Sequence, residues 1–297
     1  MYNLIVLGLR AFYIASSIAI LIVRLVPELR ARFLSYGARD DRHRGKSHEG
    51  IRPGGGGQIL DFFATFQVPH AWFIHFYAVS VASSIACLYL FRDGGYLAAH
   101  GEHFASRLPP RVCAVLMLIQ GSRRFLECLL VTKASASSHM WLGHYAIGLA
   151  FYVATNIAIW IEHLREQDTP SHASGVTETI DVLRYFRWSA LFCYTSYRQY
   201  TYHRYLSSLK KYTLPDWSSF KSVAAPHYTA ECAIYLALAL LDAPQGKTVN
   251  GTLLCAFVFV VVNLGVTADG TKSWMMQKFP ERTQEIQRRW KMIPYVW

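Results

Sequence analysis

Long apolar runs are the feature that most limits how this chain can fold, because its 297 residues include several stretches of about 20 residues with few charges. A soluble domain would show its apolar residues as stripes along helices or at alternate positions of strands. Only 16% of the residues are charged and 53% are hydrophobic, as is typical of a polytopic membrane protein. We therefore expect an all-α fold with seven transmembrane helices, at residues 3–26, 69–91, 111–131, 139–161, 179–197, 227–242 and 249–268.

The first, fifth and sixth runs depart from a simple membrane span in their flanking sequence or their length. The first leads into a long polar loop and lacks a small-residue cleavage site, so we expect a retained anchor rather than a signal peptide. The fifth is short of a full span unless Tyr197 to Tyr202 continues it. The sixth is short for an untilted helix.

Lysine and arginine residues are distributed unevenly between the loops. The first, third and fifth loops and the C-terminal tail carry 19 of them, whereas the second, fourth and sixth loops carry seven. The positive-inside rule therefore places the first group and the C-terminus in the cytoplasm. The formal net charge of +11 is mostly this bias, together with attraction to anionic lipid or to a polyanionic cofactor. The basic residues are not interleaved with base-stacking aromatics, so we expect no nucleic-acid partner.

Histidine and cysteine spacing argues against a metal site. The pairs His70/His75 and His139/His144 are five residues apart, which turns the second ring away from the helical face of the first. Membrane di-iron enzymes need closer-spaced histidine boxes to hold two metals. The six cysteines lie in or beside apolar runs without CxxC spacing, so we expect neither a metal nor a disulfide framework.

Arg123, Arg124 and Glu127 lie within the third apolar run. Charged groups at that depth require pairing or a polar cavity. One interpretation is an internal structural pair between arginine and glutamate. The other is an anion clamp, in which arginine donates to the phosphate or carboxamide groups of a cofactor.

The fifth loop places Gln199, His203 and Lys210 at i, i+4 and i+11, so that a helix leaving the membrane would carry them on roughly one face. A solvated helix beside the membrane would explain this pattern. The functional interpretation is a cytosolic pocket for a multiply charged nucleotide, with basic residues for phosphates and tyrosines for stacking on rings.

His227, Tyr228 and Glu231 follow Pro226, which favours a helix start at that residue. His227 and Glu231 are four residues apart and would share one helical face near a membrane boundary. An interfacial tyrosine beside a partly hydrated His–Glu pair is the simpler interpretation. Ionisable groups held at such a place are also candidates for a functional site, which we expect here.

Five segments, in order over residues 66–297, carry a family resemblance: 66–77, 123–128, 199–210, 226–231 and 278–294. With them the chain resembles the steroid 5α-reductase family, and within it the fungal-type branch that reduces polyprenols or polyprenals. The resemblance implies seven membrane helices in the endoplasmic reticulum and NADPH entering from the cytosol. From hydropathy and charge we expect residues 1–65 to form an N-terminal anchor helix and a basic, glycine-rich cytosolic loop. Residues 66–297 would form the reductase core, with the NADPH-binding half at about 198–297.

The resemblance also implies roles for single residues. Gln199 and His203 fall where steroid reductases have an Asn and an Asp that hold the cofactor, and Lys210 falls on a basic residue near the phosphates. His227 matches an Asn close to the cofactor, and Glu231 matches the Glu that binds the nicotinamide carboxamide. The expected cofactor-binding set is Arg123, Arg124, Gln199, His203, Lys210, Lys272, Trp274, Arg289 and Lys291.

Departures from the family pattern bear on the substrate. The substrate-polarising Tyr of steroid reductases aligns near Gln120, and their His-rich stretch after the last helix reads Thr271–Met275 here. These differences argue against a steroid 3-ketone and leave the proton donor open. We expect a long isoprenoid in a lipid-facing cleft, although core packing would also explain its aromatic residues. The expected substrate-contacting set is Gln120, Phe66, Trp72, Phe73 and Phe76.

The expected reaction is NADPH-dependent reduction of the α-isoprene double bond of polyprenal, which leads to dolichol for N-glycosylation. Hydride adds to a double bond only if an electron-withdrawing group accepts the developing charge, and an unsaturated aldehyde provides one whereas an allylic alcohol does not. We expect His227 or Tyr228 to donate a proton and Glu231 to orient the nicotinamide or His227. We expect no obligatory protein partner.

Other functions stay open. Within the family they are a steroid 3-oxo-5α reductase or another enoyl reductase. Outside it they are an enzyme like the isoprenoid-protein methyltransferases and a non-catalytic lipid-binding membrane protein.

Overall fold

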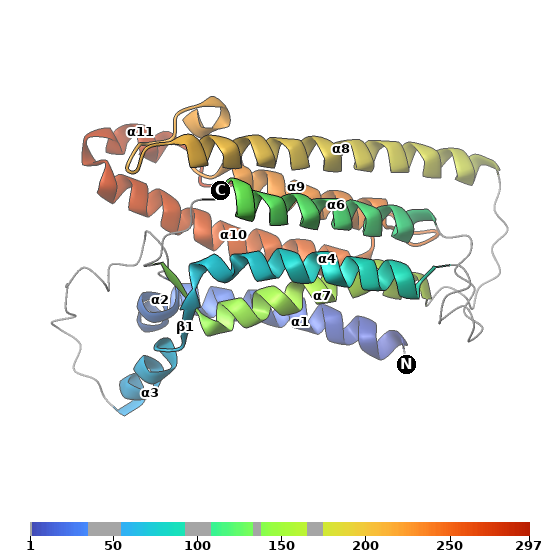
Figure 1. Cartoon of the computed structure of the whole chain (residues 1–297), viewed down its shortest axis with the longest axis horizontal. Coiled ribbons are helices and arrows are strands. Elements are labelled where there is room, and N and C mark those ends of the chain that lie inside the picture. Colours follow the sequence, from blue (N-terminus) through green and yellow to red (C-terminus); the bar gives the residue numbers. More distant parts are fainter. Residues whose placement is uncertain (1, 35–54, 93–107, 133–137, 165–174) are drawn as a thin grey trace.

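The computed structural model describes residues 2–34, 55–92, 108–132, 138–164 and 175–297, and among these it shows an elongated bundle of antiparallel helices (Figure 1). The basic, glycine-rich loop that we expected lies mostly outside the described residues. The long helices are α1 (Tyr2–Leu25), α4 (Phe73–Leu90), α6 (Leu108–Leu130), α7 (Leu142–Leu164), α8 (Gly175–Ser208), α9 (Pro226–Leu241) and α10 (Gly251–Lys278).

Each predicted apolar run overlaps most of one of these long helices or lies within it, although residues 69–72 and 139–141 belong to shorter elements, and α8 continues beyond Tyr202 to Ser208. Within the described residues, four segments are long and apolar enough to cross a membrane: α1, His70–Leu90, α7 and α10. The other three long helices, α6, α8 and α9, are too polar or too short to be included in this group. α6 carries Arg123, Arg124 and Glu127, α8 is rich in arginine and tyrosine, and α9 has only 16 residues. That all seven cross the membrane therefore stays a prediction.

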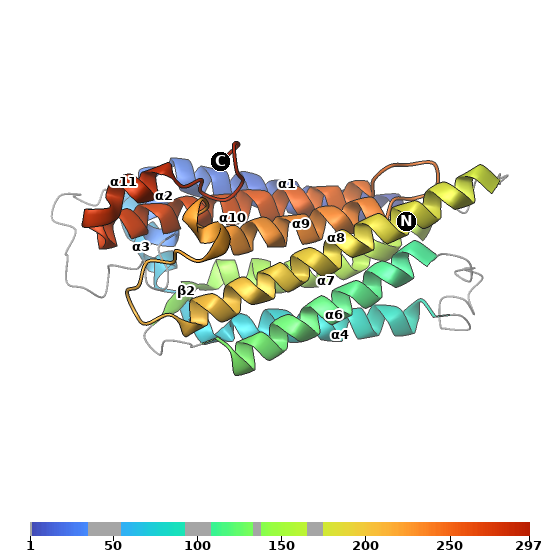
Figure 2. The same ribbon diagram turned by 90° about the horizontal axis from the view of Figure 1, so that it is seen from above.

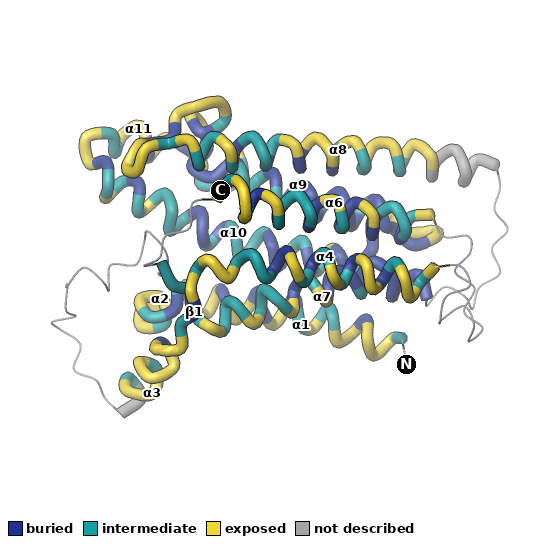
Figure 3. The backbone as a smooth tube through the Cα atoms, viewed as in Figure 1, coloured by how far each residue is buried: buried dark blue, intermediate teal, exposed yellow. Residues whose placement is uncertain are grey.

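The helices pack in pairs: α8 lies on α9, α4 on α6, and α1 on α10, as the view in Figure 2 shows. α9 is the most enclosed of the long helices, since Ile234, Tyr235, Leu238 and Leu241 are all buried. Its neighbours thus shield it from lipid, which explains how a helix of this length fits into the bundle. Figure 3 shows the opposite pattern on α8, where exposed residues recur along the outer face from residue 182 onward.

Short elements gather at the end of the bundle that holds α11 (Thr283–Arg288), which we call the α11 end (Figure 1). The strands β1 (Gln67–Pro69) and β2 (His139–Trp141) pair antiparallel there, with Val68 opposite Met140. The sequence did not predict this small sheet, because three-residue strands leave no periodic signal, and the described residues remain predominantly helical. The remaining short elements are α2 (Pro27–Phe33), α3 (Gly55–Ala64), η3 (His70–Trp72), η5 (Ser218–Lys221) and η6 (Pro280–Arg282).

The C-terminal segment returns to the start of α9 and pairs with it. Trp290 forms a parallel bridge with Val223, its carbonyl accepts from the Ala224 amide at 2.8 Å, and its amide donates to Ser222 at 2.8 Å. The Thr229 hydroxyl donates to the Met292 carbonyl. We call residues 289–292 the clasp, because they fasten the chain end to the segment that leads into α9.

A separate polar cluster ties α1, α7 and α10 together at the opposite end of the bundle. Arg10 Nη2 lies 2.7 Å from Glu162 Oε1, and the same oxygen accepts from the amide and hydroxyl of Thr252 at 2.7 and 2.6 Å. Asn250 caps α10 by accepting from the Thr252 and Leu253 amides, both at 3.0 Å. This cluster fixes the far end of the bundle.

Candidate functional site

Glu127 is the centre of a polar cluster near the α11 end. It lies one helical turn after Arg123 and Arg124 on α6, so both guanidinium groups reach its carboxylate. Arg123 pairs with Oε1 and Arg124 with Oε2, and the Glu127 side chain is only 2% exposed. A buried carboxylate with two such partners satisfies the pairing that the sequence demanded.

α8 closes the cluster from the other side through a pair of glutamines. The side-chain oxygen of Gln199, which is 2% exposed overall, accepts from Gln120 Nε2 at 3.0 Å and from Arg123. The Gln120 oxygen accepts from Arg123 Nη2 at 2.9 Å and from the Ser196 hydroxyl at 2.7 Å. Gln120 thus belongs to this polar cluster, whereas the sequence placed it with the aromatic substrate-contacting residues.

Glu231 and His203 extend the cluster to α9 and along α8. The Gln199 amide donates to Glu231 Oε2, which links residues 32 positions apart. His203 Nδ1 lies 2.7 Å from Glu127 Oε2 and 2.6 Å from Arg124 Nη1. His203 Nδ1 donates to the Glu127 carboxylate when it carries a proton, and it accepts from the Arg124 guanidinium when it does not.

Tyr77 joins from α4, although the sequence assigned it no role. Its hydroxyl oxygen accepts from Arg124 Nε at 3.2 Å and from Arg124 Nη2 at 2.7 Å. Tyr77 and Arg124 are 47 positions apart on different helices, so no spacing rule relates them. Ser196 and Glu127 were also absent from the expected site. For Glu127 the signal was available, since it lies one turn from two arginines within an apolar run.

His227 begins the first turn of α9 next to this cluster. Its ring lies 5.6 Å from the His203 ring and 4.2 Å from the Tyr228 ring, centroid to centroid. Among the described residues, its Nδ1 is a buried polar atom with no hydrogen-bond partner. Leaving such an atom unsatisfied costs about 1–3 kcal/mol, so this nitrogen needs a partner that the described residues do not supply.

The expected basic residues of the C-terminal part lie elsewhere and have other contacts. Lys272 Nζ donates to the carbonyls of Gln287 and Arg289 at 2.9 and 2.6 Å. Arg289 is buried and donates to the Pro215 carbonyl at 2.6 Å, and Lys291 Nζ lies 2.9 Å from Asp269 Oδ1. These three cations hold the clasp in place.

The tail also shows a pKa effect outside the membrane helices. Hydrogen bonds from Arg289 and Arg282 hold the pKa of the Glu285 carboxyl below its usual value. Trp274, another expected cofactor residue, meets Phe279 edge-on with ring centroids 6.3 Å apart.

Lys210 lies outside the polar cluster, exposed in the turn after α8. The prediction that it continues the helical face of Gln199 and His203 is wrong, because α8 ends at Ser208. Gln199 and His203 themselves do lie one turn apart and both join the cluster.

The expected aromatic substrate residues form a group around the start of α4. Phe73 and Phe76 have ring centroids 4.8 Å apart, and Trp72 lies 5.4 Å from the Tyr145 ring. Phe66, at the β1 side, is exposed and lies 5.1 Å from Phe62.

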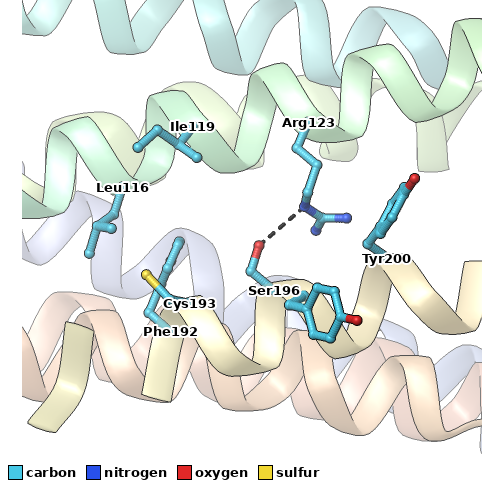
Figure 4. Close-up of a pocket in the computed structure, with 8 residues that line it drawn as sticks. Leu116, Ile119, Arg123, Phe192, Cys193, Ser196 and Tyr200 are labelled. Atoms are coloured by element: carbon cyan, nitrogen blue, oxygen red, sulfur yellow. Dashed lines mark hydrogen bonds between the residues drawn. The ribbon is translucent and has the colours of Figure 1, made fainter. Parts of the chain in front are cut away.

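A groove of about 260 Å³ opens between α6 and α8 beside the polar cluster (Figure 4). Arg123 and Ser196 face each other across it, with Arg123 Nε donating to the Ser196 hydroxyl at 3.1 Å. Its lining residues are Leu116, Ile119, Arg123, Phe192, Cys193, Ser196, Tyr197 and Tyr200.

Comparison with known proteins assigns the class to which this bundle and its buried polar cluster belong. The profile of the family described as 3-oxo-5-alpha-steroid 4-dehydrogenase matches residues 139–297, which is more than half of the chain and includes β2 and α7 to α11. The chain belongs to this family.

The names of individual relatives specify a substrate within this family. The polyprenal reductase of Saccharomyces cerevisiae is 28% identical over 224 residues, covering 75% of this chain and 74% of the relative. Polyprenal reductase 1 of Oryza sativa subsp. indica is 27% identical, covering 78% and 80%. The polyprenal reductase of Caenorhabditis elegans is 27% identical, covering 77% and 80%.

Proposed function

We propose that this chain is a membrane oxidoreductase that reduces polyprenal to dolichal with NADPH as hydride donor. The family and the names of the relatives support reduction of a CH–CH group in a polyprenal. The observation that carries the proposal is the buried cluster of Arg123, Arg124, Glu127, Gln199 and Glu231, in which three helices meet at hydrogen-bonding distance. Such groups are expensive to bury, which favours a functional use.

The chemistry requires a conjugated aldehyde. Hydride adds to the β-carbon, the electron pair of the double bond moves toward the carbonyl oxygen to form an enolate, and a proton then adds to the α-carbon. A hydrogen-bond donor at the oxygen stabilises the developing charge. The remaining double bonds of the isoprenoid are unconjugated and do not react.

NADPH fits the donors and acceptors that the cluster offers. The cofactor supplies the hydride when bound. Gln199 and Glu231 pair an amide with a carboxylate, as recognition of the nicotinamide carboxamide requires. The unpartnered Nδ1 of His227 provides a further contact, and Arg123 and Arg124 supply positive charge. Lys210 and the other expected basic residues remain proposals for the phosphate end.

Three residues are candidates for the proton donor. His227 and Tyr228 follow from the sequence, and the geometry adds Tyr77. The Tyr77 oxygen accepts two hydrogen bonds from Arg124, so its own proton remains to be donated. The nearby guanidinium also stabilises negative charge on that oxygen.

The membrane location follows from the apolar helices, and we propose the endoplasmic reticulum with the α11 end in the cytosol. The excess of lysine and arginine in the first, third and fifth loops and the tail supports this orientation. Tagging the C-terminus and digesting intact microsomes with protease tests it, because a cytosolic tag is lost without detergent whereas a lumenal tag survives.

The activity is tested with purified full-length protein, NADPH and either polyprenal or polyprenol as substrate. We expect the aldehyde to gain two hydrogen atoms by mass spectrometry and the alcohol to remain unchanged. Direct reduction of the alcohol would contradict conjugate addition. A 3-oxo-Δ4 steroid provides a third arm, because the family description names such a substrate class. Turnover of the steroid alone would favour that second function.

A further inference from the structure

We propose that the groove between α6 and α8 holds the first isoprene units of the substrate, with the carbonyl end at Arg123 and Ser196. This inference rests on the proposed function. It differs from the expected cleft at Phe66, Trp72 and Phe73, which lies around the start of α4.

The groove has an apolar end and a polar end along the same two helices. Leu116 and Ile119 on α6 face Phe192 and Cys193 on α8 at the apolar end (Figure 4). One to two turns further along both helices, the lining changes to Arg123, Ser196 and Tyr200. An unsaturated aldehyde with an isoprenoid chain has the same division, with a single polar atom at one end of a hydrocarbon.

The polar end lies at a depth that suits this substrate. Arg123 is seven residues before the end of α6, which corresponds to about 10 Å along the helix. A carbonyl there can accept from the second N–H of Arg123 Nη1, since the other Arg123 hydrogens and the Ser196 hydroxyl hydrogen already have acceptors. Arg123 also contacts Gln120 and Gln199, so the groove ends at the proposed cofactor cluster.

The outer side of the groove is exposed and mostly apolar, as a surface that faces lipid would be. Ile119 is 55% exposed and Tyr197 is 63% exposed, and the neighbouring surface of both helices carries exposed Val115, Leu126 and Phe186. A volume of about 260 Å³ is below the roughly 300–1,000 Å³ of pockets that enclose a whole drug-sized ligand. The groove therefore takes the start of the chain while the remaining units lie in lipid.

Filling the groove tests the proposal. We expect Cys193→Trp and Ile119→Trp each to raise the KM for polyprenal about tenfold or more, which corresponds to about 1.4 kcal/mol. The Kd for NADPH, measured by fluorescence titration, should change less than about twofold. Tyr194→Trp is the matched control, because Tyr194 is exposed next to Cys193 but does not line the groove. An unchanged KM in both groove variants, with active wild-type protein, would overturn the inference.

Alkylation of the wild-type protein provides an independent readout. Cys193 is exposed and lines the groove, whereas Cys255 lies half-buried on α10. We expect polyprenal to slow N-ethylmaleimide modification of Cys193 at least threefold in detergent and to leave Cys255 unaffected, as followed by peptide mass spectrometry. Equal protection by the same mole fraction of phosphatidylcholine would make the groove a general lipid contact and refute the proposal. Protection without any turnover would instead count against the proposed reduction alone.

Discussion

At the residue scale, the buried polar cluster combines contacts within one turn of α6 with contacts between helices. Arg123 and Arg124 lie about one helical turn from Glu127, so their side chains can pair on α6 itself, which was one of the two interpretations of the sequence. The contacts of Tyr77 with Arg124 and of Gln199 with Glu231 depend on which helices become neighbours. Apolar runs specify where helices lie in the chain and say little about their order around the bundle.

Tyr77→Phe tests the role of the phenol hydrogen. The variant keeps the ring and loses the hydroxyl, so we expect kcat to fall about 100-fold with little change in KM. Steady-state kinetics with polyprenal and NADPH provide the measurement. Tyr89→Phe on the exposed face of the same helix is the control and should retain full activity. Full turnover of Tyr77→Phe would assign the proton donor to His227 or Tyr228.

Glu127→Gln tests the centre of the cluster. The substitution leaves two guanidinium groups facing a neutral amide in a buried site, which we expect to lower the free energy of unfolding by about 3 kcal/mol or more. Thermal denaturation in detergent measures the shift. Glu281→Gln changes an exposed carboxylate in η6 and should leave the melting temperature unchanged. Equal melting temperatures for both variants would show that the buried pairing contributes little.

At the element scale, α8 shows which features helical periodicity can predict and which it cannot. Spacing of four residues placed Gln199 and His203 on one face, and both contact the α6 charges. The same reasoning failed for Lys210, because periodicity cannot show that a helix ends two residues earlier, at Ser208. The sequence predicted that α9 is short for a membrane span. The structure shows that neighbouring helices bury it, so a helix of 16 residues can be accommodated in the bundle.

The far-end cluster that joins α1, α7 and α10 provides a prediction for these elements. Glu162→Gln removes the Arg10 ion pair and weakens the acceptor for Thr252, so we expect a lower melting temperature. The kinetic constants for polyprenal should stay within about twofold at a temperature where the variant is folded, because Glu162 and Glu127 lie near the C-terminal ends of α7 and α6, two helices that run in opposite directions (Figure 1). A fall in kcat with an unchanged melting temperature would contradict the view that this cluster stabilises the fold without acting in catalysis.

At the scale of the whole molecule, the clasp connects the last residues to the start of α9. Deleting residues 290–297 removes the backbone partners of Ser222, Ala224 and Ala225. We expect the Kd for NADPH to rise at least tenfold while membrane insertion persists, since α1 to α10 remain. Val296→Ala, at a highly exposed position, is the control. Unchanged NADPH affinity in the truncated protein would separate the clasp from the site.

The clasp also has a consequence for the timing of synthesis. Thr229 and Met292 are 63 positions apart, and chains grow at about 5–20 residues per second. The segment leading into α9 therefore waits roughly 3–13 s for its partner after it is made. During that interval the backbone groups of Ser222, Ala224 and Ala225 lack the hydrogen-bond partners that the clasp later supplies. A chain interrupted before residue 290 therefore leaves the backbone groups of Ser222, Ala224 and Ala225 without these partners.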